Sequence, residues 1–475
     1  MGRESRVSQN FLVVLLDDHA RWALGCYGNS EIHSPSLNYL AETGARMDNA
    51  FTPTPVCSPA RACFMTGRLP SQHGVHDYLD PEDPETNERE WLADEQTLPE
   101  ILKANGYTTA LCGKWHLGAP IRRVFGFDYW YEQERPGGVA TTSANGSALQ
   151  REEVGSSNPH SLADRAIEFL RHRDRGRPFF LFVGLQATHS PWVDHPERLV
   201  SHYRTCTFED IPRDTMFPFG RLAAESLIPT RGNPREAWAQ YYAAVSEIDE
   251  QVGRLVDELD DQGIRGETLF VYTSDHGLNL GHHGLWGKGN GSKPYNMLEE
   301  SIRIPLILNQ PGRTLGGLVR AEAVTHCDSF ATILDYANVE LPNTGGSTPY
   351  PGRSYRALVE GGMQQAWPEN VFGEYGNLRM VRTPRYKLVT RHPDGPNELF
   401  DLFDDPRETL NLYNHVAHHA IRTQLEEEIA TYYSRYDEAA KSGLRVDQLP
   451  RHNAEEIWRN PDADNRWWEH THPGM

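Results

Sequence analysis

Short runs of consecutive apolar residues recur along this chain and constrain its fold more than any other feature. The four clearest runs cover residues 11–16, 107–112, 178–185 and 268–273, and segments with helical spacing separate them. A strand reads as continuously apolar when both of its faces are buried, as in a parallel sheet. The pattern therefore predicts an α/β fold with a large doubly wound, mostly parallel sheet sandwiched by helices.

The chain is longer than a single hydrophobic core usually fills, which favours a second, smaller unit. Short strands separated by turn residues are expected at 370–375, 378–382, 386–390 and 398–402, followed by a helix at about 417–433. A Gly- and Pro-rich linker at 342–351 precedes them. We therefore predict a main catalytic domain at 1–350 and, at 351–475, a C-terminal subdomain with a small antiparallel sheet, a helix and a tail.

Each of the four apolar runs is followed within a few residues by side chains that can bind a metal ion or move a proton. In chain order these are Asp17 and Asp18, Lys114 and His116, His189, and Asp275 and His276. Ligands of open α/β sheets bind beyond the carboxyl ends of the strands, so we expect these side chains to converge. Taken singly, each also has a structural interpretation, as a cap, a loop residue or a core histidine.

The stretch 54–61, Thr-Pro-Val-Cys-Ser-Pro-Ala-Arg, places Cys57 at or just before the start of a helix. Pro59 suits the first helical turn, where its missing N–H is no loss. The backbone donors exposed there stabilise an anion such as a sulfate, a phosphate or a thiolate. Cys57 alone is open to three interpretations: buried filler, a thiolate nucleophile, or the precursor of a modified residue.

The pattern Cys-x-Pro-x-Arg at Cys57, Pro59 and Arg61 resembles the modification signature of the type I sulfatases of the alkaline phosphatase superfamily. In that family the cysteine is oxidised to Cα-formylglycine, and the resemblance extends in order over nearly the whole chain. It implies a formylglycine-generating enzyme as a maturation partner. Hydration of the aldehyde gives a geminal diol: one hydroxyl attacks sulfur and displaces the alcohol, and the second expels sulfate from the sulfo-enzyme.

The same resemblance implies a site for one divalent metal ion. Its ligands would be Asp17, Asp18, Cys57, Asp275 and His276. Such oxygen-rich ligation favours Ca²⁺, with Mg²⁺ or Mn²⁺ as the alternatives. Many sulfatases carry Asn where this chain has His276, whereas iduronate-2-sulfatase-like enzymes and phosphonate monoester hydrolases carry His.

The remaining site residues also carry over from the family. Arg61 and Lys114 would hold the formylglycine hydrate, and His116 would hydrogen-bond it. His189 and Lys288 would bind the sulfate and stabilise or protonate the leaving oxygen. We expect His116 to act as the base and His189 as the leaving-group acid, although Lys288 could share these roles.

The implied function is hydrolysis of the sulfate monoester of a small aryl or carbohydrate alcohol. The first alternative is a phosphonate monoester or phosphodiester hydrolase of the same superfamily, whose pattern lacks the pair Lys114 and His116. The second is a non-enzymatic binder of sulfated ligands in which Cys57 stays a thiol. The complete set of site residues argues against the second alternative.

Composition excludes several partners. The net charge of −20, with no basic run, argues against nucleic acid and an anionic membrane. No apolar run is long enough to span a membrane, and the run at 11–16 is too short for a signal-peptide core, so we expect a cytoplasmic location. The six cysteines contain no Cys-x-x-Cys pair and predict neither a zinc ribbon nor a disulfide framework.

Two irregular segments, about 129–158 and 195–234, are expected to be loops. We expect the pocket rim to come from 76–90, 133–155 and 193–235, and from the C-terminal sheet near Glu374, Tyr375 and Arg379. The tryptophans of the tail, residues 458, 467 and 468, are expected to pack on the main domain or on a second copy of the chain in a homo-oligomer.

Overall fold

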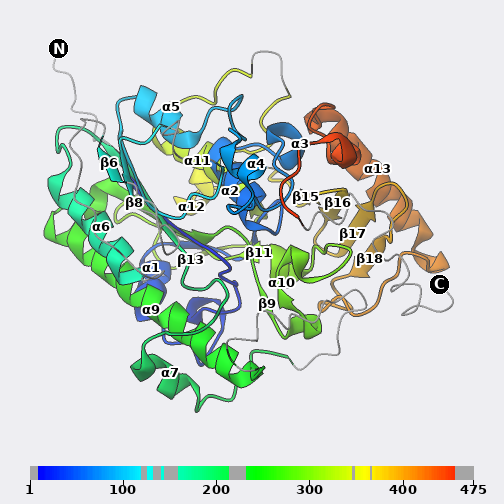
Figure 1. The fold of residues 1–475 in the computed structure, drawn as a ribbon, viewed down its shortest axis with the longest axis horizontal. Helices are drawn as coiled ribbons and strands as arrows, with labels where there is room; N and C mark the ends of the chain where they lie inside the picture. The colour runs from blue at the N-terminus through cyan, green and yellow to red at the C-terminus, as the bar shows by residue number, and fades with distance from the viewer. Residues whose placement is uncertain are drawn as a thin grey trace.

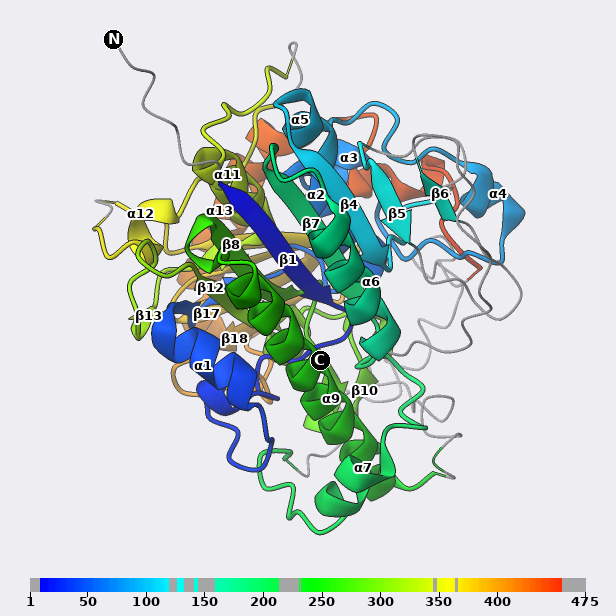
Figure 2. The ribbon, with the colours of Figure 1, turned by 90° about the vertical axis from the view of Figure 1, so that its left-hand side faces the viewer.

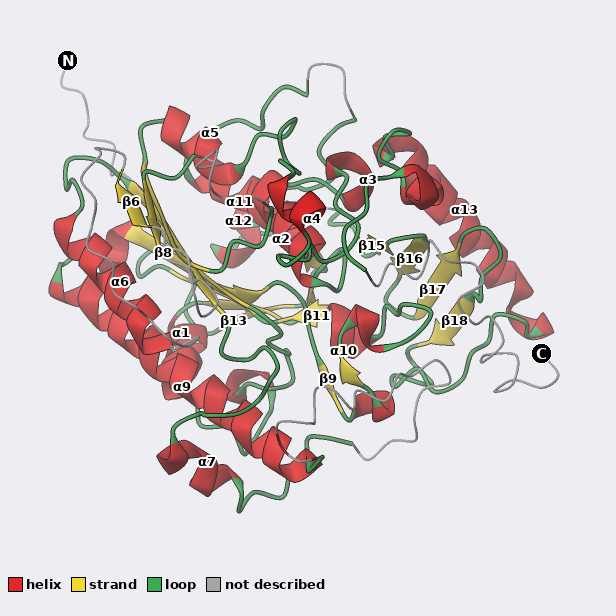
Figure 3. Ribbon diagram, viewed as in Figure 1, coloured by secondary structure: helices red, strands yellow, loops and turns green. Residues whose placement is uncertain are grey.

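A large central sheet lies between two layers of helices, with a smaller sheet and its helix at one side (Figures 1 and 3). This computed structural model describes residues 9–118, 126–131, 141–143, 159–212, 230, 232–344, 348–363 and 366–454. Among these residues, no helix has both the length and the apolar character needed to cross a bilayer.

The central sheet has the order β13-β2-β12-β8-β1-β7-β4-β5-β6. Neighbouring strands from β8 through β5 are parallel, whereas β12 is antiparallel to β8 and to β2, and β6 is antiparallel to β5. The strands are β1 (Asn10–Leu16), β2 (Ala45–Met47), β4 (Thr108–Gly113), β5 (Tyr129–Tyr131), β6 (Thr141–Ser143), β7 (Phe179–Leu185), β8 (Thr268–Ser274), β12 (Leu306–Asn309) and β13 (Leu318–Arg320). The predicted mostly parallel sheet is therefore confirmed.

Helices cover both faces of this sheet. The helices α1 (Pro35–Thr43), α6 (Pro159–His172) and α9 (Pro234–Asp261) lie on the face that Figure 2 turns to the viewer. The helices α2 (Cys57–Thr66), α5 (Leu98–Ala104) and α11 (His326–Tyr336) lie on the other face. Strand β1 is buried along its whole length, and its successive side chains enter two different cores. This explains why its sequence is uninterruptedly apolar.

The smaller sheet is antiparallel, with the order β15-β16-β17-β18. Its strands are β15 (Val371–Tyr375), β16 (Leu378–Arg382), β17 (Tyr386–Arg391) and β18 (Glu398–Asp401), and it packs against α13 (His419–Tyr436). The predicted C-terminal sheet and helix are thus present. The domain boundary between residues 350 and 351 stays a prediction.

Some local structure differs from what the sequence predicts. The segments expected to be loops contain β5, β6 and α7 (Glu197–Tyr203), and β5 forms because it pairs with the open edge of β4. Strand β11 (Arg303–Ile304) is separate from β12, because Pro305 between them has no N–H for a sheet ladder. The tail tryptophans and residues 133–140 and 144–155 of the predicted rim lie outside the described residues.

The remaining elements are short and connect these layers. They are β3 (Ala50–Phe51), α3 (Pro70–His73), α4 (Pro84–Glu88), β9 (Asn279–Leu280), β10 (Trp286–Gly287), α10 (Glu299–Ile302), β14 (Val324–Thr325) and α12 (Arg356–Val359). The loop after β10 matters most for function, because it carries Lys288.

Candidate active site

The carboxyl ends of four parallel strands deliver polar side chains to one edge of the sheet. Strand β1 is followed by Asp17 and Asp18, β4 by Lys114 and His116, β7 by His189, and β8 by Asp275 and His276. The strand ends are tied together, since Asp275 N donates to Leu16 O at 2.9 Å and Lys114 N donates to Gly184 O at 3.0 Å. The structure therefore brings together the side chains that the sequence placed after separate strands.

Cys57 lies at the centre of this group. It is the first residue of α2, preceded by Val56 in an extended conformation, and it is only 3 % exposed. Its Sγ lies 3.2 Å from Asp17 Oδ1, 3.1 Å from Lys288 Nζ and 3.4 Å from His276 Nε2. The predicted position at a helix N-terminus is confirmed, and the group on Cys57 faces both cations and carboxylates.

Two lysines make the surroundings of Cys57 favourable to negative charge. Burial opposes ionisation of the thiol, but Lys114 and Lys288 hold its pKa well below the ordinary value. Lys288 Nζ also donates to Asp18 Oδ1 at 2.6 Å, and Lys114 Nζ forms an ion pair with Asp17 Oδ2. The site thus contains the local positive charge that an acidic protein needs to bind an anion.

Arg61 connects two of the strand ends that form the site. It is buried on α2, its Nε donates to Asp275 Oδ2 at 2.9 Å, and its Nη1 donates to the Lys114 carbonyl at 2.9 Å. Its Nη2 is buried and has no hydrogen-bond partner within the part of the chain that the structure describes. Arg61 therefore joins the ends of β4 and β8 and still has a free donor.

The donor set around Cys57 fits a divalent cation. Ligand atoms of Asp17, Cys57, Asp275 and His276 lie within 4.8 Å of one another. His276 Nδ1 donates to Gly277 O at 2.9 Å, which leaves the Nε2 lone pair 3.3 Å from Asp18 Oδ1 and 3.4 Å from Asp275 Oδ1. A lone pair facing two carboxylates repels them unless positive charge lies between them. Without such an ion, burial lowers the pKa of His276, but the negative charge of Asp275 outweighs this effect and raises the pKa to about 9.

A second group with metal-binding side chains, His283, Glu300 and Glu408, lies elsewhere. Its members are already paired, because His283 Nε2 lies 2.9 Å from Glu300 Oε2 and Glu408 forms an ion pair with Lys387. His283 therefore belongs to this second group and not to the residues around Cys57.

His116 and His189 differ in orientation and exposure. His116 Nε2 donates to Leu79 O at 2.9 Å, so its Nδ1 is the nitrogen that remains available. Burial and Lys114 lower the pKa of His116, which favours the neutral form. His189 Nδ1 donates to Ser190 O at 2.6 Å, its Nε2 lies 3.8 Å from Asp18 Oδ2, and its side chain is 35 % exposed. His116 is therefore suited to accept a proton, and the more open His189 is suited to contact a leaving group.

Two site residues adopt backbone conformations that are unfavourable for side chains with a Cβ. Asp18 has φ +60° and His116 has φ +62°. Such conformations cost about 1–3 kcal/mol each and persist where surrounding contacts enforce them. Gly113, at φ +106°, permits the close approach of β4 and β7, since a Cβ there would lie 2.1 Å from Gly184 O. The edge of the sheet is thus shaped for the site at some cost in local stability.

Several supporting residues were missed by sequence reasoning. Thr188 Oγ1 donates to Asp17 O at 2.6 Å, Tyr241 OH donates to Asp18 O at 3.0 Å, and His326 Nε2 donates to Asp275 O at 2.8 Å. All three orient the aspartates through backbone carbonyls. Thr188, beside His189 at the end of β7, could have been noticed from its position, whereas Tyr241 and His326 lie on α9 and α11, which carry none of the predicted site residues.

The expected contribution of the C-terminal sheet to the pocket rim is wrong. Glu374 and Tyr375 are fully buried, and Arg379 is 8 % exposed. Glu374 accepts hydrogen bonds from Ser71 N and Oγ, and Arg379 pairs with Asp437 at 2.5 Å. These contacts fix the sheet to the rest of the chain and leave Glu374 and Tyr375 without exposed surface.

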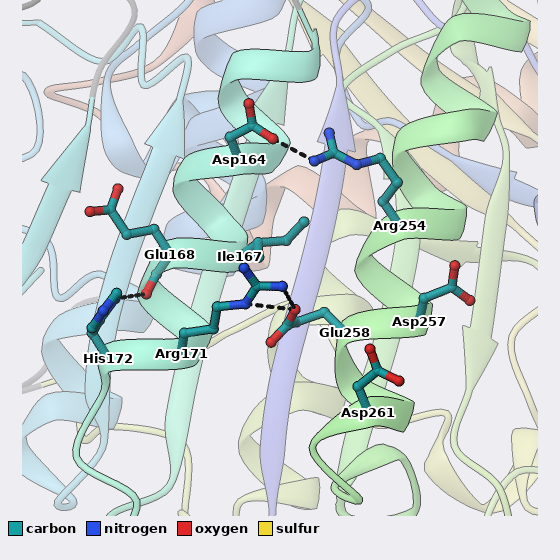
Figure 4. Close-up of a pocket in the computed structure, with 9 residues that line it drawn as sticks. All are labelled: Asp164, Ile167, Glu168, Arg171, His172, Arg254, Asp257, Glu258 and Asp261. Carbon is teal, nitrogen blue, oxygen red and sulfur yellow. Dashed lines mark hydrogen bonds and ion pairs between the residues drawn. The ribbon is translucent and has the colours of Figure 1, made fainter.

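A charged surface groove lies between α6 and α9 (Figure 4). Arg254 pairs with Asp164 at 2.5 Å, and Arg171 pairs with Glu258 at 2.7 Å. Its lining residues extend to the C-terminal ends of α6 and α9, which lead into the starts of β7 and β8. Cys57 lies at the other edge of the sheet, where these strands end. We therefore assign the groove a structural role as paired surface charge.

Comparison with protein families gives two matches. Residues 9–339 match the family described as Sulfatase. Residues 281–435 match the family described as N-sulphoglucosamine sulphohydrolase, C-terminal. The first match covers the central sheet and all the site residues.

Similar proteins match over most of their length. The chain is 26 % identical to an N-acetylglucosamine-6-O-sulfatase of Bacteroides thetaiotaomicron, covering 86 % of this chain and 84 % of the relative. It is 28 % identical to an arylsulfatase of Clostridium perfringens, covering 85 % and 90 %. A solved structure of a protein in complex with its substrate D-glucosamine-2-N,6-O-disulfate superposes with a TM-score of 0.74 at 24 % identity, covering 92 % and 99 %. At that identity the structure supports the fold.

Proposed function

This chain belongs to the sulfatase family and hydrolyses sulfate monoesters, and we propose that its nucleophile derives from Cys57 and that its substrate is a sulfated carbohydrate. The observation that carries the proposal is the position of Cys57. Its side chain lies at the start of α2, within 3.1–3.4 Å of Lys288, Asp17 and His276. A group at this point contacts a carboxylate, a histidine and a lysine of the site at once.

Conversion of Cys57 to Cα-formylglycine by a formylglycine-generating enzyme would supply, on hydration, an oxygen nucleophile at this position. Lys114 and Arg61 are placed to hold it. Lys114 approaches from the end of β4 and is already paired with Asp17, and Arg61 Nη2 is a buried donor without another partner among the described residues. The pair thus provides the positive charge that an oxygen nucleophile and a bound sulfate both require.

Asp17, Asp18, Asp275, His276 and the group on Cys57 would hold one divalent ion, for which Ca²⁺ is the best match to the oxygen-rich set. When bound, such an ion supplies positive charge that stabilises anionic oxygen. His276 fits this role because its Nδ1 is fixed on Gly277 O, which leaves Nε2 as a neutral ligand atom.

The two histidines divide the proton transfers. His189 Nε2 faces Asp18 at the open side of the site, where it would donate a proton to the departing alcohol oxygen. His116 Nδ1, left free by the bond from Nε2 to Leu79 O, would accept the proton of the hydroxyl that expels sulfate. Lys288, between Asp18 and Cys57, would neutralise the charge of the sulfate group.

A carbohydrate is the preferred alcohol for two reasons. One relative is named an N-acetylglucosamine-6-O-sulfatase, and one structure with the same fold is described in complex with a disulfated glucosamine. An aryl sulfate is the second candidate, because another relative is named an arylsulfatase. The phosphonate hydrolase alternative has less support, since the two relatives described above are named as sulfatases.

The test is release of sulfate from p-nitrophenyl sulfate and from a panel of sulfated mono- and disaccharides. The protein is co-produced with a formylglycine-generating enzyme, and mass spectrometry of the Cys57 peptide establishes conversion. We expect turnover of a sulfated sugar and its loss in Cys57→Ala. Converted enzyme that prefers an aryl phosphonate to every sulfate ester would overturn the proposal.

A further inference from the structure

The orientation of His116 depends on a backbone carbonyl from another part of the chain. His116 Nε2 lies 2.9 Å from Leu79 O, and a carbonyl oxygen only accepts, so Nε2 carries the proton. Nδ1 is buried and has no hydrogen-bond partner among the residues that the structure describes. Because the His116 backbone is also in the left-handed region, contacts outside β4 are needed to hold the ring in place.

The segment around Leu79 also contacts the helix of the nucleophile. Leu79 N donates to Ser58 Oγ at 3.0 Å, and Ser58 is the residue next to Cys57. Leu79 thus uses its N–H to contact the start of α2 and its carbonyl to contact the ring of His116. A displacement of this one residue would change the position of His116 relative to the group on Cys57.

Residues near the end of the described chain fix both neighbours of Leu79. Asn453 Nδ2 donates to Tyr78 O at 2.9 Å, and Asp80 N donates to His452 O at 3.1 Å. His452 and Asn453 are 0 % and 1 % exposed. These contacts join positions more than 370 residues apart in sequence.

The ring of His452 adds a further contact to the same segment. Its Nε2 accepts from His76 N at 3.0 Å, and the ring packs on Trp91 at 4.5 Å between centroids. Thr86 Oγ1 donates to His452 O at 3.0 Å. The two residues are therefore enclosed by the region 74–91 and have the fixed geometry that a positioning role requires.

We propose that His452 and Asn453 are positioning residues for the reaction: they hold Leu79 so that its carbonyl keeps His116 in the Nε2–H tautomer, with Nδ1 left as the nitrogen that can accept a proton. The role of His116 as proton acceptor rests on the proposed function. The geometric part of the proposal does not, because it rests on contacts within the protein: Asn453 bonds Tyr78 O, Tyr78 is joined to Leu79 through the backbone, and Leu79 O accepts from His116.

The first experiment measures kcat and KM of matched variants with a sulfate ester that the enzyme hydrolyses. Asn453→Ala should lower kcat by about tenfold with little change in KM, because a misplaced proton acceptor affects chemistry more than binding. His452→Leu should behave similarly, whereas His452→Gln, which can still accept from His76 N, should recover most of the activity. Arg445→Ala, on an exposed side chain of the same C-terminal segment, should match the unaltered enzyme.

The second experiment observes His116 directly and does not depend on turnover. Selective ¹⁵N labelling of histidine gives separate signals for protonated and unprotonated ring nitrogens, and His116→Gln identifies those of His116. We expect the Nε2–H tautomer in the unaltered protein and a shift of the His116 signals in Asn453→Ala. If Asn453→Ala does not fold, Asn453→Ser provides the same comparison with a milder change.

The outcomes separate this proposal from the proposed function. Unchanged kcat together with unmoved His116 signals in folded Asn453→Ala would overturn the positioning role. An unaltered enzyme that hydrolyses no sulfate ester, but whose His116 signals shift in the variant, would contradict the proposed function and leave the positioning role supported.

Discussion

Two clusters of buried charge in this protein look alike in composition but differ in what their groups contact. The catalytic cluster consists of the residues around Cys57: Asp17, Asp18, Arg61, Lys114, Asp275, His276 and Lys288. The second, here called the junction cluster, joins α10 to the small sheet and consists of His283, Glu299, Glu300, Arg382, Lys387 and Glu408. Both combine carboxylates, cations and histidine in a nearly dry environment.

The difference lies in hydrogen-bond donors that have no partner among the described residues. In the junction cluster Lys387 is fully buried and meets three acceptors: Met297 O at 2.7 Å, Glu299 Oε1 at 3.1 Å and Glu408. In the catalytic cluster Arg61 Nη2 has no partner among the described residues, and Cys57 lies between opposite charges. Buried charge alone therefore does not identify an active site, whereas free donors around a central nucleophile do.

The largest expected effect is that of Lys288→Met on turnover. Removing this cation from Cys57 and Asp18 should lower kcat/KM by about 10³-fold, because Lys288 faces the charge that develops on the substrate. The protein should still fold, since Asp18 also contacts His276. Steady-state kinetics on protein with a verified thermal transition measures this. If Lys288→Met retained its activity, the positive charge of Lys288 would not be needed for catalysis.

The matched change in the junction cluster is Lys387→Met. It leaves Glu299 and Glu408 buried without their shared cation, which should reduce the free energy of unfolding by about 3 kcal/mol. Turnover per folded molecule should stay within about twofold of the unaltered enzyme. Chemical denaturation and kinetics on one sample test both parts, and a loss of kcat as large as that of Lys288→Met would erase the distinction between the clusters.

Metal binding sharpens the comparison further. Both clusters contain possible ligands, but we expect one equivalent of Ca²⁺ to bind, at Asp275 and its neighbours. Ion at 100 times its Kd should add about 2.7 kcal/mol to the free energy of unfolding. Calorimetric titration should show binding lost in Asp275→Asn and retained in His283→Gln, and the reverse pattern would assign the ion to the junction cluster.

The catalytic cluster could be predicted from sequence far better than the junction cluster. Strands such as β1 are buried on both faces and are therefore uninterruptedly apolar, which locates them and the residues that follow them. Parallel strands end at one edge, so Asp17 and Asp275 were expected to meet although they lie far apart in the sequence. The hydrogen bond from Asp275 N to Leu16 O holds the two strand ends side by side. The roles of these residues came from resemblance to a family, because topology brings residues together without stating their chemistry.

Other features could not be read from the residues. The partner of His116 is the carbonyl of Leu79, and a backbone carbonyl is present at every position. Glu374 and Arg379 have the composition of a pocket rim but are buried, because side chains of Ser71 and Asp437 satisfy them. Pairing between segments distant in sequence decides such cases, and side-chain type does not reveal it.

The smallest expected effect, when it is counted per pH unit, concerns the support behind the catalytic cluster, where His326 donates from Nε2 to Asp275 O. Burial lowers the pKa of His326 to about 4. Between pH 6.5 and about 4 the unfolded chain binds a proton at this histidine that the folded protein does not bind. The free energy of unfolding therefore falls by about 1.4 kcal/mol for each unit by which the pH is lowered. Above pH 6.5 both states are neutral and its contribution is constant.

His326→Gln can keep the donor to Asp275 O and removes the titration. The variant should match the unaltered protein near pH 7 and lose less stability between pH 6 and 4, as measured by urea denaturation across pH. His283→Gln is the control in the junction cluster: Glu300 lies 2.9 Å from His283, and this histidine helps to lower the pKa of Glu300 to about 2. Protonation of His283 strengthens that contact. The variant His283→Gln should therefore lose as much stability at low pH as the unaltered protein, or more. If the free energy of unfolding depends on pH equally in the unaltered protein and in His326→Gln, His326 is not a neutral histidine that supports the catalytic cluster. The two clusters would then differ only in their hydrogen-bond donors without partners.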